Sequence, residues 1–419
     1  MLKQISLSNF KGLSIIDIGL SKLNVFVGEN GTGKSSVIQA ISVLKRSLRS
    51  SSIITDLPYL NLGPLHEIVP PAKTASISVQ GRVPVDLRAI DRQNAEFKCT
   101  VRFDTQGLSE YETEISPEPG FRNLKVHSIW TRYGVGSADP ANWQYNGFTF
   151  NFGVSPNIGI GFSLRGYSQP SQLTPDLFAI GQRIYTTLES LSQAIGVGLE
   201  RVYVVPTTRG LTEPGYPLQS SATLEFSPRA GPIPMGAALA SNLTYFSHNQ
   251  EKLSRWQKEI LGVGVKYLLE PGPLISIRNP DNRVNYVNEG FGSNQMLFVL
   301  ERIANSPEES LIAIEEPEIH VHPKSQFKFG LLACEIVKEE NKQLLLTTHS
   351  EHIISGILTA VKNGKLQPHE ISLWFFERKE MQNRATRSEV DKEGKTKGAL
   401  QSFLEATVEE LSEYVKEPH

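Results

Sequence analysis

The chain has 419 residues, enough to bury a large core, which favours one large domain with an insertion, or two domains. Lys and Arg total 42 against 44 Asp and Glu, so the formal charge of −2 gives no general sign of nucleic-acid binding, although a local basic groove stays open. The two cysteines, Cys99 and Cys334, lie outside any CxxC motif, which excludes a disulfide framework or zinc knuckle and favours a reducing compartment.

The first fifty residues predict three strands, a turn and a helix. "LKQISLSNF" alternates apolar and polar residues, "SIIDIGL" follows, and "LNVFV" is a near-continuous apolar run that ends at Gly28. We therefore expect the third strand to be central and buried. Residues 35–47 place their apolar side chains largely on one side of a helix.

The middle of the chain has a different pattern. From residue 51 to about 170, the strand-like runs "YLNLGPLHEIV", "ASISVQGRVPV", "AEFKCTVRFD" and "GFTFNFGV" are separated by turn residues, which predicts an antiparallel β elaboration. Helical periodicity over 175–199 precedes the strand-like "RVYVVP". A loop rich in Pro and Gly over 207–234 then leads to a helical stretch at about 236–261.

The last part of the chain alternates helices and strands, which is typical of α/β proteins with a mostly parallel sheet. A β-turn is expected at Glu393-Gly394, before a final helix. The predicted helices cover 294–306, 324–339, 351–362 and about 398–416, and the predicted strands cover 311–314, 343–348 and 371–376.

A phosphate-binding loop is predicted between the third strand and the first helix. "GENGTGKS" is a complete G-x-x-x-x-G-K-[ST] match in the strand-loop-helix context that this motif requires. Its glycines let backbone N–H groups point at phosphate oxygens, Lys34 would reach the β and γ phosphates, and Ser35 would supply a hydroxyl to Mg²⁺. The alternative is a glycine-rich turn that matches by chance. The predicted nucleotide-binding residues of the loop are Gly28, Glu29, Asn30, Gly31, Thr32, Gly33, Lys34, Ser35 and Ser36.

Two adjacent acids in "LIAIEEPE" provide the second half of such a site. They follow a buried strand and their side chains diverge, so we assign Glu315 to Mg²⁺ and Glu316 to the attacking water. "LLLTTHS" is another buried strand that ends at His349, whose neutral imidazole could contact the γ-phosphate or orient Glu316. Lys34, Glu316 and His349 are therefore the predicted catalytic residues, and Ser35 and Glu315 are the predicted metal ligands.

A transition-metal site built from these acids with His320 and His322 is the competing interpretation. Pro317 and Pro323 break the segment and no HExxH-like helical spacing is present, so we favour loop histidines beyond the acidic strand end. Arg209 in "VVPTTRG" also follows a strand and could touch phosphate or a partner subunit. A solvent-facing structural role is equally consistent with its position, so it is not among the predicted site residues.

These motifs in this order resemble the ABC-type ATPase head shared by SMC proteins, RecF and the OLD-like ATPases of bacteria and archaea. "LKQISLSNFKGL", "VGENGTGKSSVIQAI", "IEEPEIHVHPKSQ" and "TTHSEHII" are especially similar to the OLD-like branch, and the resemblance covers about half of the chain. It implies an α/β fold of the P-loop NTPase class, of ABC/SMC-head type, with a mixed sheet, an antiparallel β lobe and a helical insertion. The implied ATPase core comprises 1–50 and 285–419, with the β lobe and helical subdomain inserted over 51–284.

The resemblance also implies further site residues. The family has Asp followed by Glu on the acidic strand, whereas this chain has two glutamates, and the longer Glu315 can still reach the metal. "NEGFGSNQMLFVL" stands where the family carries a signature that one subunit presents to the γ-phosphate held by another. Gly292, Ser293 and Asn294 are the implied contacts. The simpler alternative is that Ser293 or Asn294 caps a helix N-terminus.

The implied function is that of a Mg²⁺-dependent ATPase that binds ATP, forms a homodimer or higher homo-oligomer around it, and acts as a switch on a protein effector. By analogy with the family, the effector would be nuclease-like, in defence against viruses or mobile elements. No DxD motif follows His349, so the chain should not cut DNA itself. The alternatives are an ATP-dependent DNA clamp of RecF or SMC type, with DNA held by clustered Lys and Arg, and a non-enzymatic ATP-binding scaffold. No run of about 18 apolar residues and no signal-like N-terminus occurs, so we expect a soluble, cytoplasmic protein without membrane contact.

Overall fold

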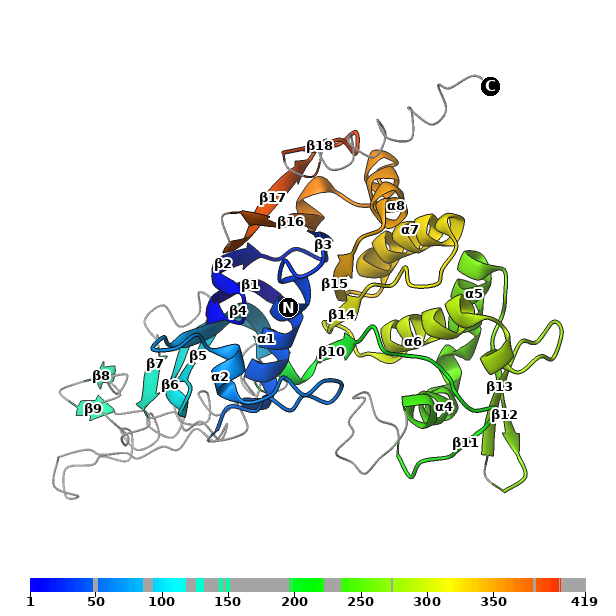
Figure 1. Cartoon of the computed structure of the whole chain (residues 1–419), viewed down its shortest axis with the longest axis horizontal. Helices are drawn as coiled ribbons and strands as arrows, with labels where there is room; N and C mark the ends of the chain where they lie inside the picture. The colour runs from blue at the N-terminus through cyan, green and yellow to red at the C-terminus, as the bar shows by residue number, and fades with distance from the viewer. Residues whose placement is uncertain are drawn as a thin grey trace. The chain divides into compact units, whose positions relative to one another are not determined.

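The protein is described by a computed structural model in which the chain forms two compact units, shown together in Figure 1. The first unit comprises 1–19, 36–57 and 61–202, and the second comprises 20–35, 58–60 and 203–419. The residues whose structure is described are 1–47, 52–85, 93–117, 126–131, 143–145, 148–150, 196, 198–221, 235–272, 274–379, 382–398 and 400.

The first unit is built on an antiparallel sheet of six strands in the order β2-β1-β4-β5-β6-β7. The two N-terminal strands join this sheet because β1 pairs with β4, so Ile5 lies opposite Val79 and Leu7 opposite Ile77. All four of these side chains are buried, as the alternation of apolar residues in both strands requires. The strands are β1 (Leu2–Phe10), β2 (Leu13–Gly19), β4 (Ala75–Val85), β5 (Gln93–Asp104), β6 (Gly107–Pro117) and β7 (Val126–Thr131).

Apart from this sheet, the first unit contains most of the helix α1 (Lys34–Ser47) and little other regular structure among the described residues. β8 (Trp143–Tyr145) and β9 (Phe148–Phe150) form a separate two-stranded sheet. The stretch "YLNLGPLHEIV", residues 59–69, was predicted as a strand. It instead contains the short helix α2 (Leu65–Ile68), and its Asn61 forms an isolated bridge with Asp56, which precedes the stretch. The helix follows Pro64, which fits the preference for proline at a helix start, so this prediction was wrong for a local reason.

The second unit is built on a mixed sheet of seven strands in the order β10-β14-β15-β3-β16-β17-β18. β3 pairs in parallel with β15 and β16, β15 pairs in parallel with β14, and β17 returns antiparallel to β16. Every residue of β3 is buried, which confirms the predicted central strand. The strands are β3 (Leu23–Gly28), β10 (Val202–Val205), β14 (Leu311–Glu315), β15 (Gln343–Thr348), β16 (Ile371–Lys379), β17 (Gln382–Val390) and β18 (Thr396–Lys397).

The helices of the second unit pack with this sheet around one apolar core. Side chains of β3, β14 and β15 share that core with those of five helices, α4 to α8, and the small sheet β11-β13-β12 lies against the helical part. Figure 1 shows α7 beside α8, and α4, α5 and α6 grouped with the small sheet. The elements are α4 (Met235–Tyr245), α5 (Gln250–Leu261), α6 (Phe291–Asn305), α7 (Pro323–Glu339), α8 (Glu351–Lys362), β11 (Tyr216–Pro217), β12 (Lys266–Glu270) and β13 (Leu274–Arg278), with single 3₁₀ turns at Ser247–Asn249, Tyr286–Asn288 and Pro368–Glu370.

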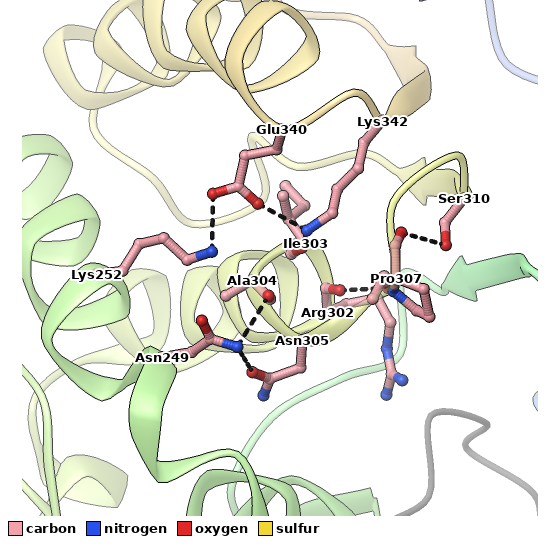
Figure 2. A network of polar contacts seen from close by, with 11 residues as sticks. Asn249, Lys252, Arg302, Ile303, Ala304, Asn305, Pro307, Ser310, Glu340 and Lys342 are labelled. Carbon is pink, nitrogen blue, oxygen red and sulfur yellow. Dashed lines mark hydrogen bonds and ion pairs between the residues drawn. The ribbon is translucent and has the colours of Figure 1, made fainter.

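A buried polar network fixes the far end of α6 to its neighbours (Figure 2). The Lys342 ammonium, 3 % exposed, donates to the carbonyl of Ile303 at 2.5 Å and pairs with Glu340 at 2.7 Å. The other oxygen of Glu340 accepts from Lys252 of α5 at 2.8 Å. Asn249, just before α5, donates to the Ala304 carbonyl of α6 and so adds a second link between these helices. Since a buried ammonium needs such acceptors, the network holds α5, α6 and the end of α7 in one arrangement.

The division into units differs from the predicted domain boundaries at 50/51 and 284/285. The N-terminal strands β1 and β2 pair with the β lobe, because their alternating pattern suits a sheet with one covered face. The helices α4 and α5 belong to the unit that carries the phosphate loop, because they share its apolar core. The turn at Glu393-Gly394 is present, with the Gly394 N–H donating to Asp391. The predicted helices over 175–199 and 398–416 lie largely or wholly outside the described residues.

Candidate nucleotide-binding and hydrolysis site

The predicted phosphate loop joins β3 to the helix α1 (Lys34–Ser47), as its sequence requires. Gly28 has φ +142°, and a Cβ there would collide with the backbone carbonyl of Phe376 in the neighbouring strand β16. Gly31 and Gly33 also have positive φ, at +76° and +102°. These backbone angles favour glycine, so the loop curls in a way that other residues would resist.

Lys34 lies folded over the loop that precedes it. Its ammonium donates to the carbonyls of Gly28 and Glu29, both at 2.7 Å, and the side chain is 6 % exposed. Burial lowers the pKa of Lys34, while the charges of nearby glutamates, Glu316 foremost, oppose that shift. The ammonium therefore stands at the mouth of the loop, where it can exchange these carbonyl oxygens for phosphate oxygens.

The two predicted metal ligands meet in the structure. Glu315, the last residue of β14, is 5 % exposed, and its carboxylate accepts hydrogen bonds from the Ser35 hydroxyl and the Thr207 N–H. Burial raises the pKa of Glu315, and those two bonds act in the opposite direction. A carboxylate and a hydroxyl side by side at a phosphate loop are the oxygen donors that a P-loop uses for Mg²⁺, so the residues fit this ion.

Glu316 and His349 lie next to this pair. Glu316 has φ +44°, and its N–H donates to the Thr347 carbonyl at 2.9 Å. The Glu316 carboxylate lies beside His349, whereas the Glu315 carboxylate is bonded to Ser35. Its carboxylate is partly exposed and lies 3.8 Å from Nε2 of His349. Burial and the charge of Lys34 lower the pKa of His349, against the effect of Glu316. The imidazole is therefore mainly neutral at neutral pH, as its predicted role requires.

A third acid of the same loop, Glu318, completes the cluster and was not among the predicted residues. One carboxylate oxygen accepts from the His349 N–H at 2.6 Å, and burial raises the pKa of the group. The other oxygen has no hydrogen-bond partner among the described residues. The signal in the sequence was the third acid of "EEPE". Spacing alone could not show that its carboxylate binds the backbone N–H of His349, 31 residues later.

The acidic loop and the start of α8 are joined by Gln326. Its amide oxygen accepts from the Ser350 hydroxyl at 2.5 Å, and its amide nitrogen donates to the Val321 carbonyl at 2.7 Å. Ser350 also caps α8 by accepting from the N–H of Ile353. The backbone at His349 is thus held from two sides, by Glu318 and by the capped helix, which fixes the position from which its imidazole projects.

Arg209 departs from the solvent-facing role considered for it. It is 6 % exposed, and its guanidinium donates to the backbone carbonyls of Glu315 at 2.7 Å and Glu316 at 2.9 Å. Burial lowers its pKa to about 10, so it stays protonated at neutral pH. The sequence showed only an arginine after a strand, and its contact with the acids needed the fold.

The predicted signature begins α6 but differs in detail from the expectation. Asn294 is 2 % exposed, and its side chain accepts from the Leu211 N–H at 2.6 Å and donates to the Leu211 carbonyl at 2.9 Å, so it is not presented to a nucleotide in this structure. Gly290 occupies the N-cap position without a side-chain bond, so neither Ser293 nor Asn294 caps the helix. Gly292 and Ser293 are partly exposed in the first turn.

The two histidines beyond the acids have structural partners. The His320 ring contacts Phe291 with ring centroids 5.3 Å apart, and Nδ1 of His322 accepts from the N–H of Lys324, capping α7. Within the described ranges, no group of three or more His, Cys, Asp or Glu side chains is placed to hold a metal ion together. The Ser35–Glu315 pair needs no such group, because nucleotide phosphates and water complete a Mg²⁺ shell of this kind.

Three features define a P-loop ATPase fold of ABC/SMC-head type: the phosphate loop between β3 and α1, the acids at the end of β14, and the mixed sheet in which β15 lies between β14 and β3. The sequence profile described as "AAA ATPase domain" matches residues 1–114 and 235–354, more than half of the chain, and the protein belongs to that family. No curated protein matches the chain. None of the helices that the structure describes is long and apolar enough to cross a membrane.

Several solved structures are similar at low sequence identity. The SMC head domain from Thermotoga maritima is 14 % identical, covers 93 % of this chain and 99 % of its own, and has a TM-score of 0.40. An Smc head bound to the C-terminal winged-helix domain of ScpA is 14 % identical over 93 % of this chain and 98 % of its own, with a TM-score of 0.45. An Smc head with an extended coiled coil, bound to the C-terminal domain of ScpA from Pyrococcus furiosus, is 14 % identical over 99 % of both chains, with a TM-score of 0.43.

Proposed function

We propose that this protein hydrolyses ATP with Mg²⁺ and acts as a nucleotide switch, closing as a homodimer on two ATP molecules and controlling a protein effector. The observation that carries the proposal is the convergence of five side chains at the ends of β3, β14 and β15. Ser35 bonds to Glu315, and Lys34 and Glu316 both act electrostatically on His349. These are the groups that P-loop hydrolysis needs, and they come from three segments far apart in the chain.

The chemistry follows from where each group lies. Lys34 exchanges its bonds to the Gly28 and Glu29 carbonyls for bonds to phosphate oxygens, which offsets charge as the terminal phosphoryl group departs. Glu316, partly exposed and beside His349, orients the attacking water and accepts its proton. The neutral His349 imidazole lies within reach to orient Glu316 or the transferred group. Ser35 and Glu315 would hold Mg²⁺, which would supply neutralisation of the phosphate charge.

The dimer rests on the first turn of α6. Phe291 is 65 % exposed, and the partly exposed Gly292 and Ser293 follow it at a helix start, where backbone N–H groups are free to meet an anion. A homodimer presents this turn to the nucleotide of its partner. The effector, its nuclease-like nature and a role in antiviral defence in the cytoplasm rest on the OLD-like sequence motifs.

The experiment compares wild type, Lys34→Ala, Glu316→Gln and the control Glu335→Gln for ATP turnover, ATP binding and mass by light scattering. Glu335 pairs with Lys365 on the exposed face of α7, away from the acids. We expect Glu316→Gln to bind ATP, lose turnover by a factor of about 100 or more and accumulate as a dimer, with the control unchanged. Turnover that survives in Glu316→Gln, or mass that never responds to ATP, contradicts the proposal.

Duplex DNA added to the same assays separates this proposal from a DNA clamp. The clamp requires DNA to bind only in the ATP-closed state, with affinity that falls steeply as salt rises. The effector switch requires turnover and mass to respond to ATP with DNA absent and to change little when it is added.

A further inference from the structure

Arg209 occupies an unusual position for a buried cation, because its nearest partners are backbone carbonyls. Nη1 donates to the carbonyls of Pro206 and Glu315, both at 2.7 Å, and Nη2 donates to the carbonyl of Glu316 at 2.9 Å. The two acids proposed for metal binding and water activation are thus held through their main chain. Their carboxylates stay available for chemistry.

The backbone that Arg209 holds is under local strain. Glu316 has φ +44°, a left-handed conformation that residues other than glycine seldom adopt. Two further backbone hydrogen bonds support this residue: its N–H donates to the Thr347 carbonyl at 2.9 Å, and its carbonyl accepts from the Ile319 N–H at 3.3 Å. The guanidinium fork bridges the carbonyls of two successive peptide units, Glu315–Glu316 and Glu316–Pro317, so it stabilises the turn at Glu316 from which the two carboxylates diverge.

Two residues further along, the same segment is bound to α6. The Leu211 backbone exchanges two hydrogen bonds with the Asn294 side chain, at 2.6 and 2.9 Å, and Asn294 is buried in the first turn of that helix. A second contact reinforces the link, since a Cβ at Gly292 would collide with the carbonyl of His320, in the loop that follows the acids. The start of α6 and the acidic loop therefore lie against each other.

We infer that the segment Pro206–Leu211 is a strut that couples the first turn of α6 to the catalytic acids, with Arg209 as a positioning residue at one end and Asn294 as its anchor at the other. The inference rests on the proposed ATP-sandwich dimer. In that dimer, the first turn of α6 meets the nucleotide of the partner, while Glu315 and Glu316 act on the nucleotide of their own subunit. A displacement of α6 on closure passes through Leu211 and Arg209 to the backbone of the acids, so each site responds to the occupancy of the other.

The chemistry of the guanidinium makes the test selective. Arginine presents a planar fork that reaches several carbonyls at once, whereas lysine keeps the charge but offers a single ammonium. Arg209 also faces the carboxylates of Glu318, Glu315 and Glu316, so Arg209→Lys preserves the charge balance of the site and removes only the fork. A defect in Arg209→Lys therefore reports positioning.

The first measurement is kcat for ATP hydrolysis together with Kd for a fluorescent ATP analogue, for wild type, Arg209→Lys and Lys342→Met. Lys342 is the matched control, because it is another buried cation that donates to a backbone carbonyl, that of Ile303. Its network contains neither Glu315 nor Glu316. For Arg209→Lys we expect kcat to fall by a factor of about 10–100 with Kd changed less than about threefold, because the phosphate loop is untouched. For Lys342→Met we expect kcat within about threefold of wild type and a lower melting temperature.

The coupling is tested by Asn294→Leu, which removes both bonds to Leu211 at similar volume. We expect ATP affinity of the monomer to stay within about threefold and the rise of turnover with protein concentration to be lost. The double variant with Arg209→Lys should be no slower than Arg209→Lys alone, because both changes break the same strut. Asn294→Asp, which keeps the acceptor for the Leu211 N–H, serves if Asn294→Leu does not fold, and its expected turnover is intermediate.

The outcomes distinguish a failure of the strut inference from a failure of the proposed ATPase function. If wild type hydrolyses ATP, Glu316→Gln does not, and Arg209→Lys retains wild-type kcat, the strut is overturned and the proposed function stands. Additive effects of Arg209→Lys and Asn294→Leu overturn the coupling alone. If wild type shows no ATP-dependent turnover or dimer, the proposed function fails first, whatever Arg209 does.

Discussion

Nε2 of His349 lies 3.8 Å from a carboxylate oxygen of Glu316, close enough for attraction and too far for a hydrogen bond. Nε2 has no hydrogen-bond partner among the described residues, while the backbone N–H of the same histidine is held by Glu318 at 2.6 Å. The ring is therefore anchored at its main chain and unbonded at its tip. A nucleotide phosphate or the attacking water can take the place beside Nε2, between histidine and acid.

The pH dependence of turnover should carry the signature of His349. Burial and Lys34 lower its pKa below the ordinary 6.5, so the ring is neutral above that pH and gains a proton only as the pH falls through the lowered value. We expect turnover to stay level from pH 8 down to about 6.5 and to fall below it, and His349→Asn to reduce kcat by a factor of about 10–100. His352→Asn, an exposed histidine of α8, is the control. A fall in activity that already begins above pH 7, and that His349→Asn removes, would contradict the neutral ring.

Glu318 should cost the protein stability at neutral pH. Burial raises its pKa in the folded state, so the folded chain holds that proton more tightly than the unfolded chain, and stability is lost as pH rises through the folded pKa. Glu318→Gln keeps an oxygen acceptor for the His349 N–H and has no charge to bury. We expect its melting temperature to exceed that of wild type at pH 7–8, and the difference to vanish as pH falls below the ordinary value of 4.5.

The measurement is thermal unfolding by circular dichroism across this pH range, with Glu251→Gln, an exposed glutamate of α5, as the control. A variant less stable than wild type at pH 8 would mean that attraction to the cations outweighs burial. A gain in stability with a loss of turnover would mark Glu318 as a residue retained for function.

Periodic patterns in the sequence predicted most of the second unit. The buried runs at 23–28, 311–315 and 343–348 form the parallel strands, and the helix predicted over 351–362 has those bounds in the structure. Long apolar runs and helix caps are local signals, so they can be recognised in the sequence without knowledge of the fold. The membership of β1 and β2 in the sheet of the first unit was missed, because strand pairing depends on partners more than sixty residues away.

The candidate site was predictable to the extent that motifs carry it. Lys34, Ser35, Glu315, Glu316 and His349 were expected together, and the structure brings them together. Arg209 and Glu318 form hydrogen bonds with backbone atoms of other segments, so no pattern of side chains in the sequence could predict their roles. Asn294 lies in the helix turn where it was expected. Its bonds to Leu211 were not predicted, because Leu211 belongs to a segment whose course only the fold reveals.

Alanine substitutions at two glycines of the phosphate loop with positive φ, Gly28 and Gly31, should destabilise the protein to different extents. A Cβ at Gly28 would collide with the carbonyl of Phe376, its neighbour in the parallel pairing of β3 and β16, whereas a Cβ at Gly31 meets no atom within 4 Å. We expect Gly28→Ala to lower the free energy of unfolding by about 3 kcal/mol or more, through overlap and backbone strain together. Gly31→Ala should cost about 1–2 kcal/mol, through strain alone. Urea unfolding followed by tryptophan fluorescence measures both, and equal losses would refute the close approach at Gly28.

The proposed dimer can be challenged at one position of α6. Ser293 is partly exposed in the first turn, and its carbonyl accepts from Gln257 at 2.8 Å, so its side chain can be enlarged without breaking that bond. In a Glu316→Gln background, we expect Ser293→Arg to abolish the ATP-dependent rise in mass, because a long cation would fill the space meant for the partner's nucleotide. ATP affinity of the monomer should stay within about threefold, since the phosphate loop is unchanged. Glu251→Arg, the same new side chain on an exposed face of α5, should still dimerise. If Ser293→Arg dimerises as well, the first turn of α6 does not face the partner, and the sandwich arrangement must be abandoned even if hydrolysis itself is intact.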